Sequence, residues 1–234
     1  GQAYAVSVVG NYAYVADGTS GLAIIDISNP GSPGSPVYMN TNGQAYAVSV
    51  VGNYAYVADG TSGLAIIDVS DPTIPNTPVY MAVNSGAVKG VDVIAGYAYL
   101  AHSSDGLVII NVSDPTNPGS PVYMSTTGVN SYGVTVSGNY AYIADGSAGL
   151  AIIDVSDPTI PGSPIYMNTN NTAWGVTVSG NHAYLANTSA GLVVIPLNSG
   201  TINDTALNSA TLTLPDIGAA GSLAVNKALV IDTT

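Results

Sequence analysis

A polar residue recurs at one position of the chain, each time directly after a short apolar run. This position holds Asp17, Asp59, His102, Asp145 and Asn187. A ring of oxygen ligands at one end of a molecule would suit calcium or another polar ligand. The alternative is structural, because Asp-Gly forms tight turns in which the carboxylate caps its own backbone. The structural interpretation is favoured, since the chain lacks the Asp-x-Asp clustering of an EF-hand loop. No cofactor is expected, calcium is the one weak candidate, and no metal ligand is assigned.

A second polar position follows the next apolar run and precedes an Asx-Pro pair. It holds Asp26, Asp68, Asn111 and Asp154. Acid–base catalysis by carboxylates needs two acids at a defined separation with split pKa values. Acids repeated at every copy of a unit are instead expected to bond loop amides. The position therefore predicts a structural role.

No residue set predicts an enzyme. Neither His102 nor His182 stands in a nucleophile motif, and the chain has no cysteine. Lys89 and Trp174 break the repetition of the chain near the first strand of their units. Either could mark a ligand-binding face, but sequence drift is the simpler interpretation. We therefore expect a protein without catalytic residues.

Composition restricts the possible partners and location. The 234 residues carry a net charge of −12 with only two Lys and no Arg, so nucleic acid and anionic membrane surfaces are not expected partners. No apolar run is long enough for a membrane span, so membrane insertion is not expected. Few charges and many small polar residues favour an extracellular or cell-surface protein. Candidate N-glycosylation sequons begin at Asn111, Asn170, Asn187 and Asn203, and Asn187 is expected to lie in an exposed turn.

One unit of 42 or 43 residues is copied along the chain. Its marker is a Gly-Leu pair that begins at Gly21, Gly63, Gly106, Gly149 and Gly191. Residues 43–68 are identical to residues 1–26. Each copy has four β-rich runs separated by Gly, Asn and Pro turns, and nothing has helical period. Four short antiparallel strands per unit predict the blade of a β-propeller, because stacked blades bury both faces of each sheet. A β-solenoid would need shorter coils, and tandem sandwiches would need longer units.

The sequence thus predicts a single all-β propeller domain over 1–234, with five full four-stranded blades and a partial sixth. The expected blades cover residues 1–42, 43–85, 86–128, 129–171, 172–217 and, in part, 218–234. The pattern frays after Gly191, where Ala210–Leu214 is the expected fourth strand of the fifth blade. Residues 222–232 resemble the first two strands of another unit. An unfinished blade exposes an unpaired edge, so we expect head-to-tail self-association through 218–234.

The repeated unit, GNYAYVADG followed by GLAIIDVSDP, is similar to the LVIVD repeat found in bacterial and archaeal surface or secreted proteins. Copies one to four match closely, copy five matches partly, and 218–234 matches only in its opening. The resemblance implies a β-propeller in an extracellular setting and implies no reaction.

Two functions from different classes remain open alongside an enzyme. The first is a non-enzymatic structural or adhesive surface protein, which could assemble into a filament or surface layer. The second is a glycan- or cation-binding module that uses the Asp17-type ring and recognises surface glycans. A glycan-processing enzyme is the least favoured, because nothing singular stands in the repeats.

Overall fold

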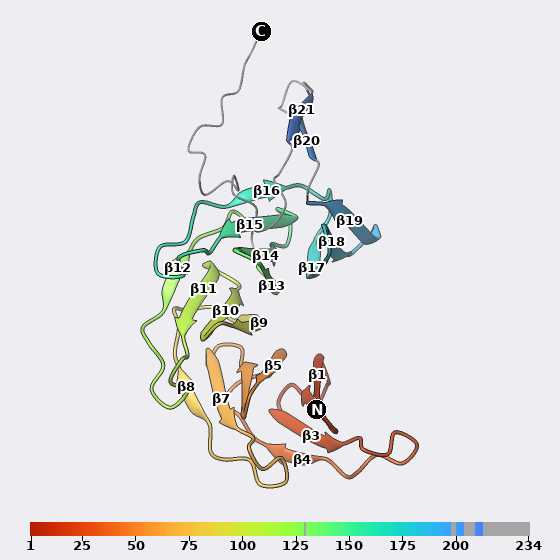
Figure 1. Cartoon of the computed structure of the whole chain (residues 1–234), viewed down its shortest axis with the longest axis vertical. Helices are drawn as coiled ribbons and strands as arrows, with labels where there is room; N and C mark the ends of the chain where they lie inside the picture. Colours follow the sequence, from red (N-terminus) through yellow and green to blue (C-terminus); the bar gives the residue numbers. More distant parts are fainter. Residues whose placement is uncertain (129, 198–199, 204–208, 213–234) are drawn as a thin grey trace.

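The computed structural model describes residues 1–128, 130–197, 200–203 and 209–212 (Figure 1). The first sheet contains β1 (Ala5–Val9), β2 (Tyr12–Ala16), β3 (Leu22–Asp26) and β4 (Val37–Met39). The second contains β5 (Ala47–Val51), β6 (Tyr54–Ala58), β7 (Leu64–Asp68) and β8 (Val79–Met81). The third contains β9 (Val88–Ile94), β10 (Tyr97–His102), β11 (Gly106–Asn111) and β12 (Val122–Met124).

The fourth sheet contains β13 (Gly133–Ser137), β14 (Tyr140–Ala144), β15 (Leu150–Asp154) and β16 (Ile165–Met167). The fifth contains β17 (Ala173–Ser179), β18 (His182–Asn187) and β19 (Gly191–Pro196). A separate pair consists of β20 (Gly200–Asn203) and β21 (Ser209–Leu212). Every pairing is antiparallel between neighbours in sequence, so each sheet is a simple meander.

The sheets stand side by side along a curved arc (Figure 1). Their first strands, β1, β5, β9, β13 and β17, contact one another in that order on the inner side of the arc. The short fourth strands β4, β8, β12 and β16 lie at the outer edge. Each of the three middle sheets therefore presents one face to the preceding sheet and the other to the following one.

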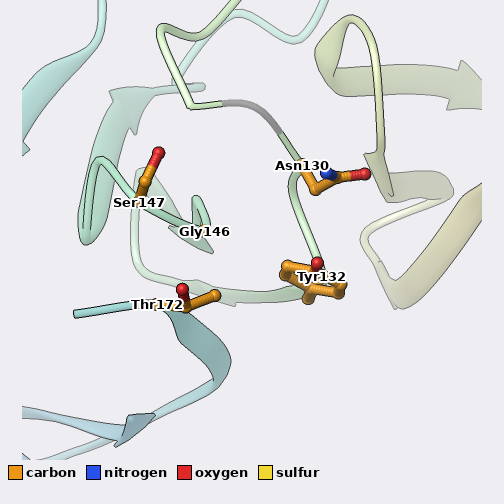
Figure 2. A pocket seen from close by; sticks show the side chains of 5 residues that line it. All are labelled: Asn130, Tyr132, Gly146, Ser147 and Thr172. Atoms are coloured by element: carbon orange, nitrogen blue, oxygen red, sulfur yellow. The ribbon is translucent and has the colours of Figure 1, made fainter. Parts of the chain in front are cut away.

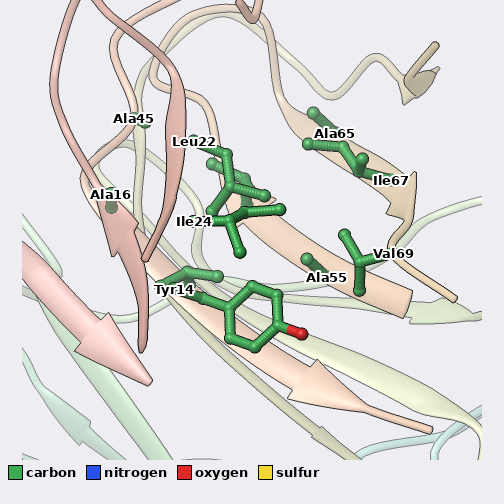
Figure 3. Packing of buried hydrophobic residues seen from close by; sticks show 11 residues of the cluster. Tyr14, Ala16, Leu22, Ile24, Ala45, Ala55, Ala65, Ile67 and Val69 are labelled. Carbon is green, nitrogen blue, oxygen red and sulfur yellow. The ribbon is translucent and has the colours of Figure 1, made fainter. Parts of the chain in front are cut away.

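Four apolar cores fill the spaces between neighbouring sheets. In the first core, Leu22 and Ile24 of β3 pack against Ile67 and Val69 at the end of the second sheet (Figure 3). The third strand is apolar on both sides because its alternate residues enter two different cores. Ile67 faces the first sheet, whereas Leu64 and Ile66 face the third. Burial of this kind contributes about 25 cal/mol per Å² of apolar surface, so sheet stacking is the main source of stability.

The glycine before each third strand has the conformation that the turn requires. Gly21, Gly63, Gly106, Gly149 and Gly191 all have positive φ, between 69° and 86°. This is the left-handed region that residues with a Cβ atom rarely occupy. The predicted turn is confirmed at all five copies.

The predicted fourth strand of the fifth blade is wrong. In the described residues the fifth sheet has three strands, and β21, which covers part of the expected segment, pairs with β20 instead. The predicted partial sixth blade, 218–234, lies outside the described residues. In the part of the chain that is described, no helix is long and apolar enough to cross a membrane.

Candidate functional site

Asp59 follows β6 and is fully buried. Thr41 Oγ1 donates to its Oδ1 atom over 2.6 Å, and the Gly43 amide donates to its Oδ2 atom over 2.9 Å. Both donors belong to the linker that joins β4 of the first sheet to β5 of the second. Burial raises the pKa of Asp59, and these hydrogen bonds lower it in part. The carboxylate therefore holds the incoming linker against its own sheet.

Asp145 makes the same type of contact in the fourth sheet and is also fully buried. Its Oδ1 atom accepts hydrogen bonds from Thr126 Oγ1 over 2.7 Å and from Ser131 Oγ over 2.6 Å. Its Oδ2 atom accepts from the Gly128 amide over 2.8 Å. In the first sheet, the amino group of Gly1 lies 3.5 Å from Asp17 Oδ2. Asp59 and Asp145 thus share the linker contact, and Asp17 lies near the equivalent glycine.

These contacts differ from the sequence-based interpretation in one respect. The carboxylates of Asp59 and Asp145 do not cap their own turns, which are closed by backbone bonds such as Ser62 N to Asp59 O. They bind linker residues that come 14 to 19 positions earlier. The sequence predicted that the carboxylate caps its own turn, whereas Asp59 and Asp145 hold the incoming linker against the sheet.

His102 replaces the aspartate in the third sheet and is fully buried. Its Nδ1 atom accepts a hydrogen bond from the Asp105 amide over 3.1 Å, which requires an unprotonated nitrogen there. Burial lowers the pKa of His102, against the opposing influence of the Asp105 carboxylate. Gly86 makes room for the ring, because a Cβ atom at Gly86 would lie 2.6 Å from His102 Cε1. The third sheet thus uses a neutral imidazole where others use a carboxylate.

The lowered pKa of His102 predicts a pH-dependent stability. The unfolded imidazole titrates near its ordinary pKa of about 6.5, so the unfolded chain takes up the proton first as the pH falls. The stabilisation is present above that pH and is lost as the pH falls toward the folded-state pKa. We expect the melting temperature to fall more steeply between pH 7 and 5 in the wild type than in H102N.

The control variant is H182N, since His182 is the other histidine and is exposed. It should keep the wild-type pH profile, as measured by circular dichroism melting. Equal profiles for the wild type and H102N would show that burial of His102 has no such effect.

Asn187 occupies the position in the fifth sheet and is buried, with 6% of its surface exposed. Its Nδ2 atom donates to Thr169 Oγ1 over 3.0 Å and to the Asn171 carbonyl over 3.3 Å. The expectation that this sequon lies in an exposed turn is therefore wrong. Among the other candidates, Asn111 and Asn170 are exposed, and the Asn203 side chain lies outside the described residues.

The five ring positions remain in five different sheets. Across the described ranges, three or more His, Cys, Asp or Glu side chains do not gather where they could hold a metal ion.

The aspartates at the second polar position are also dispersed. Ser28, Ser70 and Ser156 each donate their amide to the aspartate two residues earlier. These hydrogen bonds lower the pKa of Asp26 and of Asp68.

A different set of side chains does gather, at the start of the innermost strands. One repeat position holds Tyr4, Tyr46, Lys89, Tyr132 and Trp174, which we call the axial rim. The rings of Tyr4 and Tyr46 lie 5.1 Å apart, and those of Tyr132 and Trp174 lie 4.0 Å apart. Lys89 Nζ lies 4.2 Å from the centre of the Tyr132 ring. Lys89 and Trp174 stood out in the sequence as breaks in the repeat that could mark a ligand-binding face. Alignment of the copies also places Tyr4, Tyr46 and Tyr132 at the same position.

A pocket of about 170 Å³ adjoins the axial rim between the fourth and fifth sheets (Figure 2). Its lining is Asn130, Tyr132, Gly146, Ser147 and Thr172. The lining thus combines one aromatic ring with an amide and two hydroxyl groups. Such a surface can pack against an apolar face and exchange hydrogen bonds with polar groups at its edge.

Antiparallel sheets stacked around an arc, each with its first strand innermost, define a β-propeller. The fold class predicted from the sequence is confirmed. The model of the LVIVD repeat matches residues 1–41, 42–78, 85–123, 130–169 and 170–196. The chain therefore belongs to the LVIVD repeat family, as its resemblance implied.

Solved structures show the same fold at low sequence identity. A functionally unknown protein from Desulfotomaculum acetoxidans is 15% identical, with a TM-score of 0.66, and the match covers 90% of this chain and 69% of that one. The Cps50 (Swd1) β-propeller domain of Myceliophteria thermophila is 10% identical, with a TM-score of 0.65 and coverage of 92% and 74%. The Neurospora crassa Pan2 WD40 domain is 14% identical, with a TM-score of 0.61 and coverage of 82% and 62%, so this chain spans less than two thirds of it. No curated protein matches the sequence.

Proposed function

We propose that the protein is a non-enzymatic, extracellular structural protein that assembles with copies of itself head-to-tail. The observation that carries this proposal is a pair of apolar faces at the two ends of the arc. Leu192 of β19 is 65% exposed, whereas Leu22, Leu64, Leu107 and Leu150 at the same repeat position are fully buried. Val194 is exposed in the same way, although its counterpart Ile66 is buried.

In the described residues, the opposite face is exposed at the other end of the arc. Val6 of β1 is 61% exposed, whereas Val48 at the same position of an identical 26-residue sequence is 8% exposed. The two valines differ in exposure only because of their surroundings. Val48 packs against the first sheet, whereas Val6 has no preceding sheet in the described part of the chain. We name the Leu192 side the trailing face and the Val6 side the leading face.

The two faces are of complementary kinds. At each of the four cores, the face of one sheet that corresponds to the trailing face packs on the face of the next sheet that corresponds to the leading face. The trailing face of one copy can therefore pack on the leading face of another copy in the manner already used within the chain. Because the two faces differ, the contact is heterologous and continues into a filament unless its rotation closes a ring.

Composition and the resemblance to the family support the extracellular setting. The asparagines of two sequons, Asn111 and Asn170, are exposed and so accessible to glycosylation. The repeated acids support a role without catalysis, since those of Asp59 and Asp145 bind the linkers. The predicted contact through 218–234 lies outside the described residues, so the proposal rests on the two faces. An adhesive role is compatible with such an assembly.

The test uses one charged variant for each face. V6D and L192D each place an unpaired charge at a contact that would be apolar, which is costly to bury. In sedimentation velocity, the wild type should form large species as its concentration rises, and each variant alone should remain monomeric. An equimolar mixture should form dimers, because each variant keeps one intact face.

I160D is the matched control, because Ile160 is an exposed isoleucine in a loop between β15 and β16. It should assemble like the wild type. A wild type that remains monomeric at high concentration would overturn the proposal, as would assembly that both face variants leave intact. Dimers formed by V6D alone would show a symmetric contact instead.

A further inference from the structure

The axial rim has an exposed aromatic platform at its end. Trp174 is 51% exposed, although one side of its indole ring is stacked on Tyr132 with an angle of 31° between the ring planes. The other contacts of the rim fix its neighbours. Lys89 Nζ lies over the Tyr132 ring and donates to Asn130 Oδ1 over 3.2 Å. Tyr132 thus contacts both Lys89 and Trp174, and Trp174 is the more exposed ring of the stack.

Polar groups line the pocket beside Tyr132, the ring on which Trp174 is stacked. The lysine hydrogen bond uses the oxygen of the Asn130 amide, and the nitrogen of that amide is a donor with two protons. Thr172 and Ser147 contribute hydroxyl groups to the adjoining pocket (Figure 2). On the opposite part of the rim, Gln44 Nε2 donates to Tyr4 OH over 2.8 Å, and Tyr46 OH donates to Gln44 Oε1 over 2.9 Å. Side-chain amides thus bond to rim residues at both parts of the rim.

We propose that the rim binds neutral glycans, with a sugar ring stacked on Trp174 and its hydroxyl groups bonded to Asn130, Ser147 and Thr172. A pyranose ring has an apolar C–H face and an edge of hydroxyl groups, so it matches an aromatic surface bordered by amide and hydroxyl groups. This site is distinct from the Asp17-type ring and is independent of self-assembly.

Charge selects a neutral ligand over an ionic one. An organic cation would meet the ammonium group of Lys89, which already occupies one side of Tyr132. An anion would approach a chain with a net charge of −12 that offers one lysine at this site. That lysine is already engaged by Asn130 and Tyr132. Neutral oligosaccharides avoid both penalties.

Trp174 is the single tryptophan of the chain, so its emission reports this site alone. We expect cellohexaose or maltohexaose to shift and quench the emission of the wild type in a saturable way. T172A keeps the reporter and removes one hydroxyl group, so the same titration should show an affinity at least threefold weaker. W174A, measured by calorimetry, should weaken binding about tenfold or more, and W174Y should restore part of it.

Y38A is the matched control, because Tyr38 is an exposed aromatic residue on the outermost strand β4. It should bind like the wild type, and all variants should melt at similar temperatures. Emission that is unchanged at millimolar concentrations of both oligosaccharides would overturn the proposal. Binding that survives W174A would also overturn it, as would salt-sensitive binding of oligogalacturonate alone.

Discussion

The variant G149V is expected to lose about 3 kcal/mol or more of its free energy of unfolding. Gly149 has a φ of 86°, and a Cβ atom there would overlap the carbonyl oxygen of Met167 on the neighbouring strand β16. The left-handed conformation alone costs a residue with a Cβ about 1–2 kcal/mol. Displacement of β16 adds the loss of a strand pairing that consists of only three residue pairs. Urea denaturation followed by circular dichroism measures the difference.

Gly191 supplies the matched control. Its φ is 69°, but no heavy atom of the described residues lies within 4 Å of the position that a Cβ would take. G191V should therefore lose only the cost of the left-handed backbone conformation, about 1–2 kcal/mol of the free energy of unfolding. G21V and G63V should behave like G149V, because their Cβ atoms would overlap the carbonyl oxygens of Met39 and Met81. Equal losses for G149V and G191V would show that the neighbouring strand moves aside at little cost.

The variant D145A is expected to lose about 3 kcal/mol or more of its free energy of unfolding. Removal of the carboxylate leaves the buried Ser131 and the partly buried Thr126 and Gly128 without their acceptor. Each buried donor left unpaired costs about 1–3 kcal/mol, and water that enters the vacated space recovers part of that cost. Thermal unfolding and hydrogen exchange of the Gly128 amide would both report the change.

D154A tests whether the effect belongs to the linker contact. Asp154 is also an aspartate at the end of a strand in the fourth sheet, but its hydrogen bond goes to the nearby Ser156 amide in an exposed setting. We expect D154A to lose less than about 1 kcal/mol. Similar losses in D145A and D154A would contradict the role of Asp145 as the link between the incoming linker and the sheet.

The period of the sequence predicted the strands, the turns and the stacking of the sheets. This worked because each of these features depends on local residues: a glycine with positive φ, a Gly-Asn turn, or a strand that is apolar on both sides. The partners of Asp59 and Asp145 could not be predicted in the same way. They lie in linkers that only the folded sheet brings close, so a local pattern suggested a cap on the turn itself. The burial of Asn187 was missed for the same reason.

The fifth copy shows another limit of local patterns. A fourth strand in this fold is short, and β16 pairs with β15 through only three residue pairs. So few pairs specify the register weakly, and a β-rich segment such as β21 can pair elsewhere. The axial rim was missed because its residues differ in type. Its importance follows from their shared position, where ring contacts such as Tyr132 to Trp174 form across neighbouring sheets.

The acids of the outer loops give the molecule a directional surface. Asp71, Asp114 and Asp157 are exposed in the loops that lead to the outermost strands, and bonds from Thr73, Thr116 and Thr159 lower the pKa of each. These loops therefore stay ionised in mildly acidic media, while the two end faces are apolar. In the proposed assembly, the charged outer loops would lie along the flanks, and the apolar faces would lie at the contacts between copies. Repulsion between these charged loops would oppose side-by-side bundling of filaments at low ionic strength. Salt would permit bundling, because it reduces the screening length to about 10 Å at 0.1 M.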